Sequence, residues 1–251
     1  MAYEYLAKVY DRLMYETGTD YELWADYLEE LFREYNAPGK TILDLGCGTG
    51  ELSLKLIERG YSLLGVDISA EMLEVFRTKA EEKKIDVSLF CQDMCELKIE
   101  DKVEIIISCF DTFNYLRSLE DITKALTEAE KILLPGGIMI FDLNSEYKLR
   151  ELYGNEVYSY LEDDFAYIWD NSFDFEQREC VMEITFFVKE GSEDCYRRIE
   201  ELHLQKAYYP EEIKRAIDQS GLELLAVYAD LEKNAPDEES EKHFYICRKK
   251  F

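Results

Sequence analysis

Three glycines fall within five residues in the segment ILDLGCGTGELSLKL, which runs from Ile42 to Leu56 and begins with an apolar stretch. Glycine allows positive φ angles and lets other groups approach the backbone closely. The free N–H groups at the start of a helix favour an electron-rich or anionic partner. We interpret the segment as a strand over 41–45, a tight turn, and a helix that begins near Gly50. This pattern predicts a ligand-binding loop, and the surrounding residues must identify its ligand.

The glycine spacing differs from that of two common phosphate-binding loops. A dinucleotide-binding loop has the pattern G-x-G-x-x-G, but its third glycine would fall where this chain has Glu51. A P-loop has Lys and then Ser or Thr after its last glycine, whereas this chain has Glu51 and Leu52. The observed pattern is Asp44 followed by G-x-G-x-G, which starts at Gly46 and Gly48. Asp44 has no role in a pyrophosphate-binding turn.

Two further carboxylates end predicted strands downstream. Asp67 ends the apolar stretch in SLLGVDI (62–68), where an acid can accept hydrogen bonds from two ribose hydroxyls. Asp93 ends VSLFCQD (87–93), within reach of the exocyclic amine of a purine. Such strand ends share the carboxyl edge of a parallel sheet, where these folds bind ligands. Each acid alone could be a turn or cap residue, but Asp44 and Asp67 around three glycines favour a binding role.

The composition is that of a soluble globular protein. The 251 residues suit one domain with an elaboration, and 47% of them are hydrophobic and 33% charged. No run of about 18 apolar residues occurs, so we expect no membrane association, and the N-terminus lacks the pattern of a signal peptide. The seven cysteines include no CxxC pair. We therefore expect reduced thiols in a cytoplasmic protein, with neither a disulfide framework nor a metal site.

The net charge argues against one class of partner. The chain has 55 acidic and 29 basic residues, which gives a formal net charge of −26. Such a charge repels the phosphate backbone of nucleic acids. The one dense basic cluster is Arg248-Lys249-Lys250 at the end of the sequence. We expect no nucleic-acid partner, and the oligomeric state is left open.

Alternating helices and strands must position these residues. Helices are predicted over 3–17, from Asp20 to about 35, from Gly50 to about 59, from Ser69 to about 84 and over about 121–134. Strands are predicted over 41–45, 62–68, 87–93, 103–110 and 138–144, with a Pro-Gly-Gly turn over 135–137. The apolar face of the second helix is predicted to include Leu23 and Trp24. Continuous apolar strands separated by helices predict a parallel sheet covered on both faces.

The pattern changes after Asn144. Residues 153–207 alternate aromatic and polar side chains without helical periodicity, which predicts a small antiparallel sheet. A helix is expected from Pro210 to Gly221, and the stretches LELLAVYA and HFYICRK are expected to close the chain as two strands. We divide the chain into an N-terminal helical cap (1–36), a core (37–150 and 208–251) and an inserted antiparallel sheet (151–207).

These motifs resemble the class I S-adenosylmethionine-dependent methyltransferases over most of the chain. LDLGCGTG is similar to the family's cofactor loop, GVDIS to its ribose-binding strand end, CQDM to its adenine-binding element and LLPGGIMIFD to its turn into strand five. A small-molecule branch with an antiparallel insertion after strand five is the most similar, through VYDRLM (9–14), CFDTFNYL (109–116) and HLQKAYY (203–209). The resemblance implies an α/β, Rossmann-like, mostly parallel seven-stranded sheet with a reversed C-terminal hairpin, plus the antiparallel insertion.

The resemblance also implies S-adenosyl-L-methionine as the cofactor and a set of residues that bind it. This set is Tyr10, Asp44, Gly46, Cys47, Gly48, Asp67, Ile68, Asp93, Met94 and Phe110. Within it, Gly46 would contact the methionine part and Asp67 the ribose. Asp93 would meet the adenine amine, while the Met94 N–H would meet a ring nitrogen.

Two residues are candidates for the chemistry itself. Tyr10 is expected to line the cofactor or acceptor pocket, because aromatic faces stabilise cations; a tyrosine in an amphipathic segment can equally be a core residue. His203 is a candidate base, and a purely structural role in a strand is an equal alternative. Phe110 and Asp111 would lie under the sulfonium. His243 is interpreted as a surface residue of the closing hairpin, without a role.

The implied reaction is in-line displacement of a methyl group from a sulfonium by a nucleophile of the acceptor. The leaving group is already activated, so the protein mainly positions the acceptor and excludes water. A base is needed only if the acceptor loses a proton. The insertion is the expected lid and acceptor wall for a small-molecule acceptor, for which an amine is one candidate. Two alternatives stay open, namely an RNA or protein methyltransferase and a non-catalytic S-adenosylmethionine-binding module.

Overall fold

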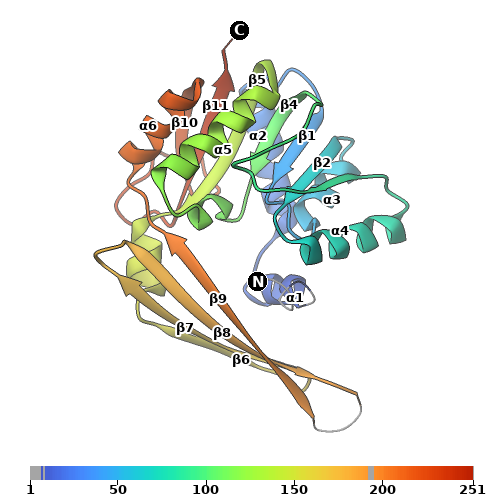
Figure 1. Cartoon of the computed structure of the whole chain (residues 1–251), viewed down its shortest axis with the longest axis vertical. Helices are drawn as coiled ribbons and strands as arrows, with labels where there is room; N and C mark the ends of the chain where they lie inside the picture. Colours follow the sequence, from blue (N-terminus) through green and yellow to red (C-terminus); the bar gives the residue numbers. More distant parts are fainter. Residues whose placement is uncertain (1–6, 8, 192–194, 251) are drawn as a thin grey trace.

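The computed structural model describes residues 7, 9–191 and 195–250, and it contains two β-sheets (Figure 1). The seven-stranded sheet has the order β10-β11-β5-β4-β1-β2-β3. Its strands are β1 (Thr41–Leu45), β2 (Ser62–Asp67), β3 (Ser88–Cys91), β4 (Val103–Ser108), β5 (Leu133–Asn144), β10 (Leu222–Ala229) and β11 (Lys242–Lys249). Strands β1 to β5 pair in parallel, whereas β11 is antiparallel to both β5 and β10. The predicted fold, with its reversed C-terminal hairpin, is confirmed.

Helices cover both faces of this sheet. They are α2 (Tyr21–Glu34), α3 (Glu51–Glu58), α4 (Ala70–Lys83), α5 (Leu119–Ile132) and α6 (Pro210–Ser220). Successive side chains of β1 point to opposite faces, so Ile42 packs in the cluster formed by α2, α3 and α4, and Leu43 packs with α5 and α6. Burial on both faces explains why the strands are continuous apolar runs.

The four-stranded sheet has the order β6-β7-β8-β9 and is antiparallel throughout. Its strands are β6 (Val157–Leu161), β7 (Phe165–Asp174), β8 (Glu179–Lys189) and β9 (Tyr196–Lys206), and they follow a 3-10 helix η2 (Thr112–Tyr115) and a π-helix η3 (Lys148–Tyr153) along the chain. The antiparallel pairing predicted for this region is confirmed. In Figure 1 the long strands of this sheet extend away from the seven-stranded sheet.

A short helix, α1 (Tyr10–Glu16), lies between the two sheets (Figure 1). Leu13 packs in a cluster with apolar residues of β7, β8 and β9 and with Met72 of α4. On one side Arg12 pairs with Asp164 at 2.8 Å, next to the β6–β7 turn. On the other side Asp11 pairs with Lys79 of α4. Both sheets are therefore joined through α1.

Several local predictions are corrected. Leu23 is 51% exposed, because the buried face of α2 runs through Trp24, Leu28 and Leu31, at helical spacing, and leaves Leu23 beside it. The segment 135–137 is not a separate turn but part of β5, where the pairing with β4 shifts register. His243 is 8% exposed rather than on the surface, because β11 is an inner strand between β5 and β10.

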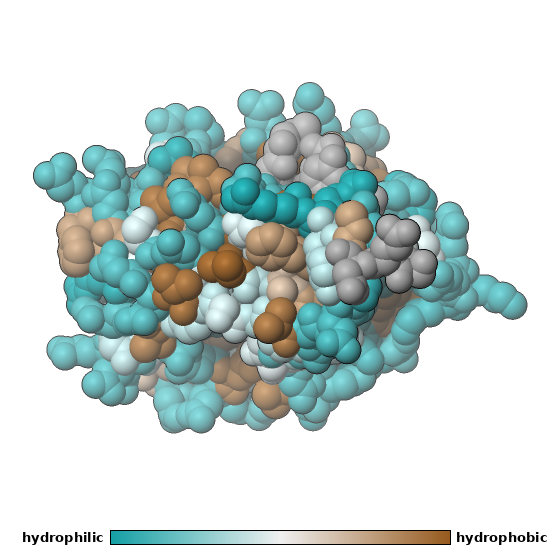
Figure 2. Space-filling model, turned by 90° about the horizontal axis from the view of Figure 1, so that it is seen from below, coloured by the Kyte–Doolittle hydropathy of each residue, from teal (hydrophilic) through white to brown (hydrophobic). Residues whose placement is uncertain are grey.

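The remaining observations concern the N-terminal helix, membrane-spanning helices and the surface. Of the helix predicted over 3–17, the structure has only α1, which Val9 and Thr17 flank as turn residues, while residues 1–6 and 8 lie outside the described residues. Among the residues described, no helix is long and apolar enough to cross a bilayer. Seen from below, the molecule presents a mostly hydrophilic rim with hydrophobic residues interspersed (Figure 2).

Candidate functional site

A cavity of about 1470 Å³ lies between the seven-stranded sheet, α1 and the four-stranded sheet. From the large sheet it is lined by residues that end or follow β1, β2, β3 and β4, which is the carboxyl edge of the parallel strands. From the small sheet it is lined by side chains of β7, β8 and β9. Pockets for one small ligand measure roughly 300–1000 Å³. The cavity is therefore large enough for a cofactor together with an acceptor.

The three glycines of the loop serve different purposes. A Cβ on Gly46 would lie 2.4 Å from Thr112, and one on Gly50 would lie 2.3 Å from the Phe76 ring. These two positions require glycine because the protein packs against them. A Cβ on Gly48 would meet nothing within 4 Å, although its φ of +53° disfavours other residues. Gly48 lines the cavity, so its bare backbone is open to a ligand.

Asp44 lies at the end of β1 and is 3% exposed. Its Oδ2 accepts a hydrogen bond from the Ser53 hydroxyl at 2.5 Å. Burial raises the pKa of Asp44 to about 7; the Ser53 hydrogen bond opposes the shift and the Asp67 charge adds to it. Asp44 is thus a carboxylate that the fold makes costly to ionise, next to the glycine loop.

Asp67, at the end of β2, joins the loop to the helix that follows. Its Oδ2 accepts from the Gly48 N–H at 2.8 Å, and its Oδ1 accepts from the Ser69 N–H at 2.9 Å. Burial raises its pKa, and these backbone N–H groups counteract the shift. Each carboxylate oxygen has a second lone pair, so Asp67 can still accept hydrogen bonds from hydroxyls in the cavity.

The next part of the cavity is lined by Ile68, Asp93, Met94 and Cys47. Ile68 is 66% exposed, which is unusual for a large apolar side chain and suits the face of a ring. Asp93 is also exposed, and its Oδ1 accepts from the Cys95 N–H at 2.8 Å. The Cys47 N–H donates to the Val66 carbonyl at 3.0 Å, which fixes the loop against β2. The open glycine backbone at Gly48, the apolar face of Ile68 and the carboxylate acceptors at or just beyond the strand ends fit S-adenosylmethionine.

The turn after β4 is strained. Phe110 and Asp111 both have positive φ, at 61° and 55°, which is costly for residues other than glycine. The Phe110 ring packs against Trp24 and Tyr21 of α2, with centroid distances of 4.2 and 5.4 Å. The Asp111 N–H donates to Asp142 Oδ2 at 3.0 Å. Packing and hydrogen bonds on both sides therefore hold this turn in place.

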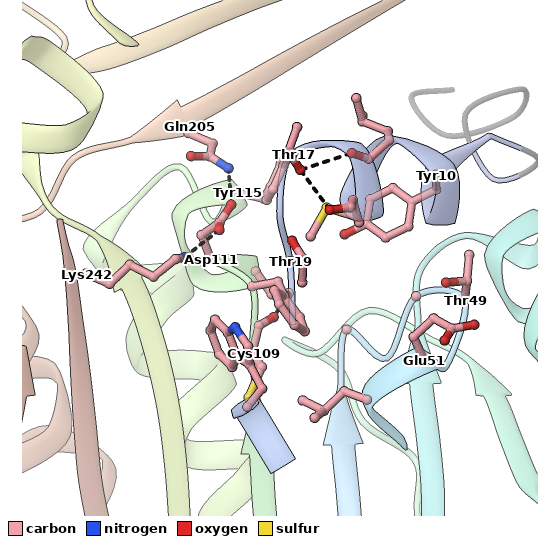
Figure 3. Close-up of a pocket in the computed structure, with 18 of the residues that line it drawn as sticks. Tyr10, Thr17, Thr19, Thr49, Glu51, Cys109, Asp111, Tyr115, Gln205 and Lys242 are labelled. Carbon is pink, nitrogen blue, oxygen red and sulfur yellow. Dashed lines mark hydrogen bonds and ion pairs between the residues drawn. The ribbon is translucent and has the colours of Figure 1, made fainter. Parts of the chain in front are cut away.

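A buried network surrounds the Asp111 carboxylate (Figure 3). Lys242 Nζ lies 2.7 Å from Asp111 Oδ1 and 2.8 Å from Asp142 Oδ2, and Gln205 Nε2 donates to Asp111 Oδ2 at 2.5 Å. Burial alone would raise the pKa of Asp111, but Lys242 holds it below its usual value. Asp111 is therefore an ionised carboxylate at the junction of the two sheets.

Two segments that are distant in the sequence meet at this junction. The Asn114 side chain donates to the backbone carbonyl of Lys206 at 2.9 Å and to that of Asn144 at 3.1 Å. Asn144 in turn donates to Gln205 Oε1 at 3.0 Å. The stretches 109–116 and 203–209, which carried the resemblance, are thus hydrogen-bonded to each other. The sequence alone did not identify Gln205 or Lys242 as part of this junction.

Both candidate catalytic residues line the cavity. His203 is 3% exposed, and its Nδ1 lies 3.3 Å from the Tyr115 hydroxyl. Burial lowers the pKa of His203, although Glu201 and Asp111 oppose this, so the imidazole favours its neutral form. Tyr10 projects from α1 into the cavity (Figure 3), and burial raises its pKa. Sequence reasoning missed Trp169 and Lys148, which line the same cavity from β7 and η3.

A family profile described as a methyltransferase domain matches residues 42–137. A Geobacillus sp. protein named as a methyltransferase is 32% identical over 99% of this chain and 100% of its own length. The crystal structure of an S-adenosylmethionine-dependent methyltransferase from Clostridium acetobutylicum is also 32% identical, covers 99% of both chains and has a TM-score of 0.89.

A third similarity is more partial. The chain is 27% identical to "dTDP-3-amino-3,4,6-trideoxy-alpha-D-glucopyranose N,N-dimethyltransferase" of Streptomyces venezuelae, over 54% of this chain and 56% of that protein. The two full-length matches define the class of protein. The chain belongs to the class I S-adenosylmethionine-dependent methyltransferases, and its cofactor is S-adenosylmethionine.

Proposed function

We propose that this methyltransferase acts on a small molecule that carries an amine. The observation that carries the proposal is the charge of the cavity wall. Two lysines, Lys148 and Lys242, line the cavity. The carboxylates that line it are Asp20, Asp44, Glu51, Asp67, Asp93, Asp111, Asp230, Glu232 and Glu241. A cleft lined mainly by one sign of charge concentrates ligands of the opposite sign. The wall therefore favours acceptors that are cationic in solution.

When bound, S-adenosylmethionine supplies a methyl group on a positively charged sulfur. We assign its binding to Gly48, whose backbone is open, to Asp67 for the ribose hydroxyls, and to Ile68, Asp93 and Met94 for the adenine. The open backbone and the exposed apolar face support this assignment. Five more residues complete the proposed set. Gly46 and Cys47 contribute through the loop backbone and Phe110 through the strained turn, and the other two are Tyr10 and Asp44.

His203 has the properties of a proton acceptor. An amine that is protonated in water must lose a proton before its lone pair can attack. The neutral form of His203 is favoured by burial, and Tyr115 orients the ring through Nδ1. The four-stranded sheet and α1 form part of the cavity wall, which reduces the access of water to the acceptor nitrogen. Tyr10 also lines the cavity, and an aromatic ring there can stabilise a cation.

Two findings support a small acceptor over a macromolecule. The Streptomyces venezuelae relative is named for N,N-dimethylation of a dTDP-linked amino sugar. The net charge of −26 disfavours RNA, because phosphate backbones need basic side chains for affinity. The volume of the cavity, which exceeds the needs of one ligand, favours a catalyst over a module that only binds the cofactor.

A metabolite screen tests the proposal. Purified protein is incubated with S-adenosylmethionine and fractionated small-molecule pools, and S-adenosylhomocysteine release is measured. We expect release with an amine-containing fraction and a product that mass spectrometry shows to have gained a methyl group on nitrogen. His203→Gln serves as the matched variant and should bind S-adenosylhomocysteine but form little of it from S-adenosylmethionine and the acceptor. Transfer of labelled methyl to macromolecules, with none to small molecules, would refute the proposal.

A further inference from the structure

Trp169 of β7 lies in the wall of the cavity. Its Nε1 is buried and makes no hydrogen bond within the part of the chain that the structure describes. The ring contacts Tyr153 and Tyr158, with centroid distances of 5.4 and 6.0 Å. The Tyr158 hydroxyl already donates to the Leu152 carbonyl at 2.6 Å. Buried donors in proteins are nearly always hydrogen-bonded, so an unpartnered one on a side chain that lines a cavity suggests a bound ligand.

The strand register fixes where Trp169 lies relative to His203. Met182 of β8 pairs with His203 of β9, whereas Trp169 pairs with Ile184, the next residue of β8 on the same face. Trp169 is therefore two strands across and two residues along from His203. With strands about 4.8 Å apart and a rise of about 3.4 Å per residue, their backbones are roughly 12 Å apart.

The floor between these two residues is apolar. Met182 and Ile184 both line the cavity and lie between His203 and Trp169 on the inward face of the sheet. The polar groups lie at the two ends. At the His203 end are Asp111 and Tyr115. At the Trp169 end the indole N–H is joined by aromatic rings, and Lys148 Nζ lies 5.5 Å from the centroid of the Tyr153 ring.

We propose that the Trp169 N–H binds a hydrogen-bond-accepting oxygen at the far end of the methyl acceptor. The acceptor is then an elongated amine with an apolar, ring-containing middle, whose nitrogen lies near His203 and whose oxygen lies near Trp169. This inference rests on the proposed function, since it requires the acceptor to bind in this cavity. Its recognition element is a hydrogen-bond donor, from which an ether or a carbonyl oxygen can accept.

Two probes of equal shape test this directly. Para-methoxyphenethylamine has an ether oxygen where para-ethylphenethylamine has a methylene group. Each is titrated into ¹⁵N-labelled protein saturated with S-adenosylhomocysteine, which keeps the probes out of the cofactor region. The chain has two tryptophans, so two indole cross-peaks are expected, and Trp169→Phe assigns them by removing one. The Trp24 cross-peak then reports that this variant is folded.

We expect the methoxy probe to bind wild-type protein about 5-fold more tightly than the ethyl probe, as for one net hydrogen bond. The Trp169 indole proton should shift downfield with the methoxy probe alone. Trp169→Phe should abolish the preference, whereas the control Tyr61→Phe, which lies outside the cavity, should retain it. Equal affinities in wild-type protein, no binding of either probe, or an unchanged preference in Trp169→Phe would overturn the inference. Failure of the proposed function is seen separately, as the absence of S-adenosylhomocysteine release in the metabolite screen.

Discussion

Replacing Asp44 by Asn should raise the free energy of unfolding relative to wild type, and this gain should grow as the pH rises. The unfolded carboxyl has an ordinary pKa of 3.8, whereas burial raises the pKa of folded Asp44 to about 7. Between these values the folded state holds a proton that the unfolded state has lost, so wild-type stability falls as the pH rises through this window. A shift of about three pKa units corresponds to roughly 4 kcal/mol. Asn cannot ionise and avoids this cost.

The difference in free energy of unfolding between Asp44→Asn and wild type separates the effect of Asp44 from that of the other titrating groups. Linkage predicts that the free energy of unfolding of Asp44→Asn, minus that of wild type, grows by about 2.5 kcal/mol between pH 5 and pH 8. Urea unfolding at several pH values measures this difference. Asp101→Asn, at an exposed loop position, is the control and should follow wild type at every pH. A difference that stays constant with pH would refute the argument from burial.

Three further predictions concern the rest of the site. Asp67→Ala should weaken S-adenosylhomocysteine binding by about 1–3 kcal/mol, because hydroxyls lose a charged acceptor, and unchanged affinity in calorimetry would contradict the ribose assignment. His203→Gln should lower kcat far more than it changes the affinity for S-adenosylhomocysteine. In the wild-type enzyme, burial lowers the pKa of His203, so the acid limb of the pH–rate profile should lie below about pH 6.5. Lys242→Met should lower the free energy of unfolding in urea by about 3–5 kcal/mol, because Asp111 and Asp142 would lose the cation that pairs with both. Adding Asp142→Asn to this variant should restore part of the lost stability. An undiminished stability of Lys242→Met would show that the network does not need its lysine.

The sequence predicted what depends on local pattern. Gly48 and Asp67 could be placed at one sheet edge because strand ends are visible in the sequence and parallel strands share that edge. The sequence could not predict which residues of the insertion meet the core. Gln205 reaches Asp111 across 94 positions, and this contact depends on the path of a whole antiparallel sheet. The burial of His243 had the same origin, because it depends on where β11 inserts between other strands.

Trp169 was missed for a different reason. In the sequence it is one aromatic residue in an alternating stretch, and such residues usually pack in a core. Only the structure shows that Trp169 lines the cavity and that its N–H is buried without a hydrogen-bond partner among the described residues.

The division of the cavity between two parts of the chain bears on how such an enzyme can diverge. The residues proposed to hold the cofactor, apart from Tyr10, lie between 44 and 110, whereas those proposed to hold the far end of the acceptor lie in 153–206. Exchange of the second segment could therefore give a new substrate preference on an unchanged cofactor site. The hydrogen bonds from Gln205 to Asp111 and from Asn114 to Lys206 limit such exchanges. A transplanted segment must keep a side-chain donor at position 205 and a free backbone carbonyl at position 206, while the sequence between the strands is open to change.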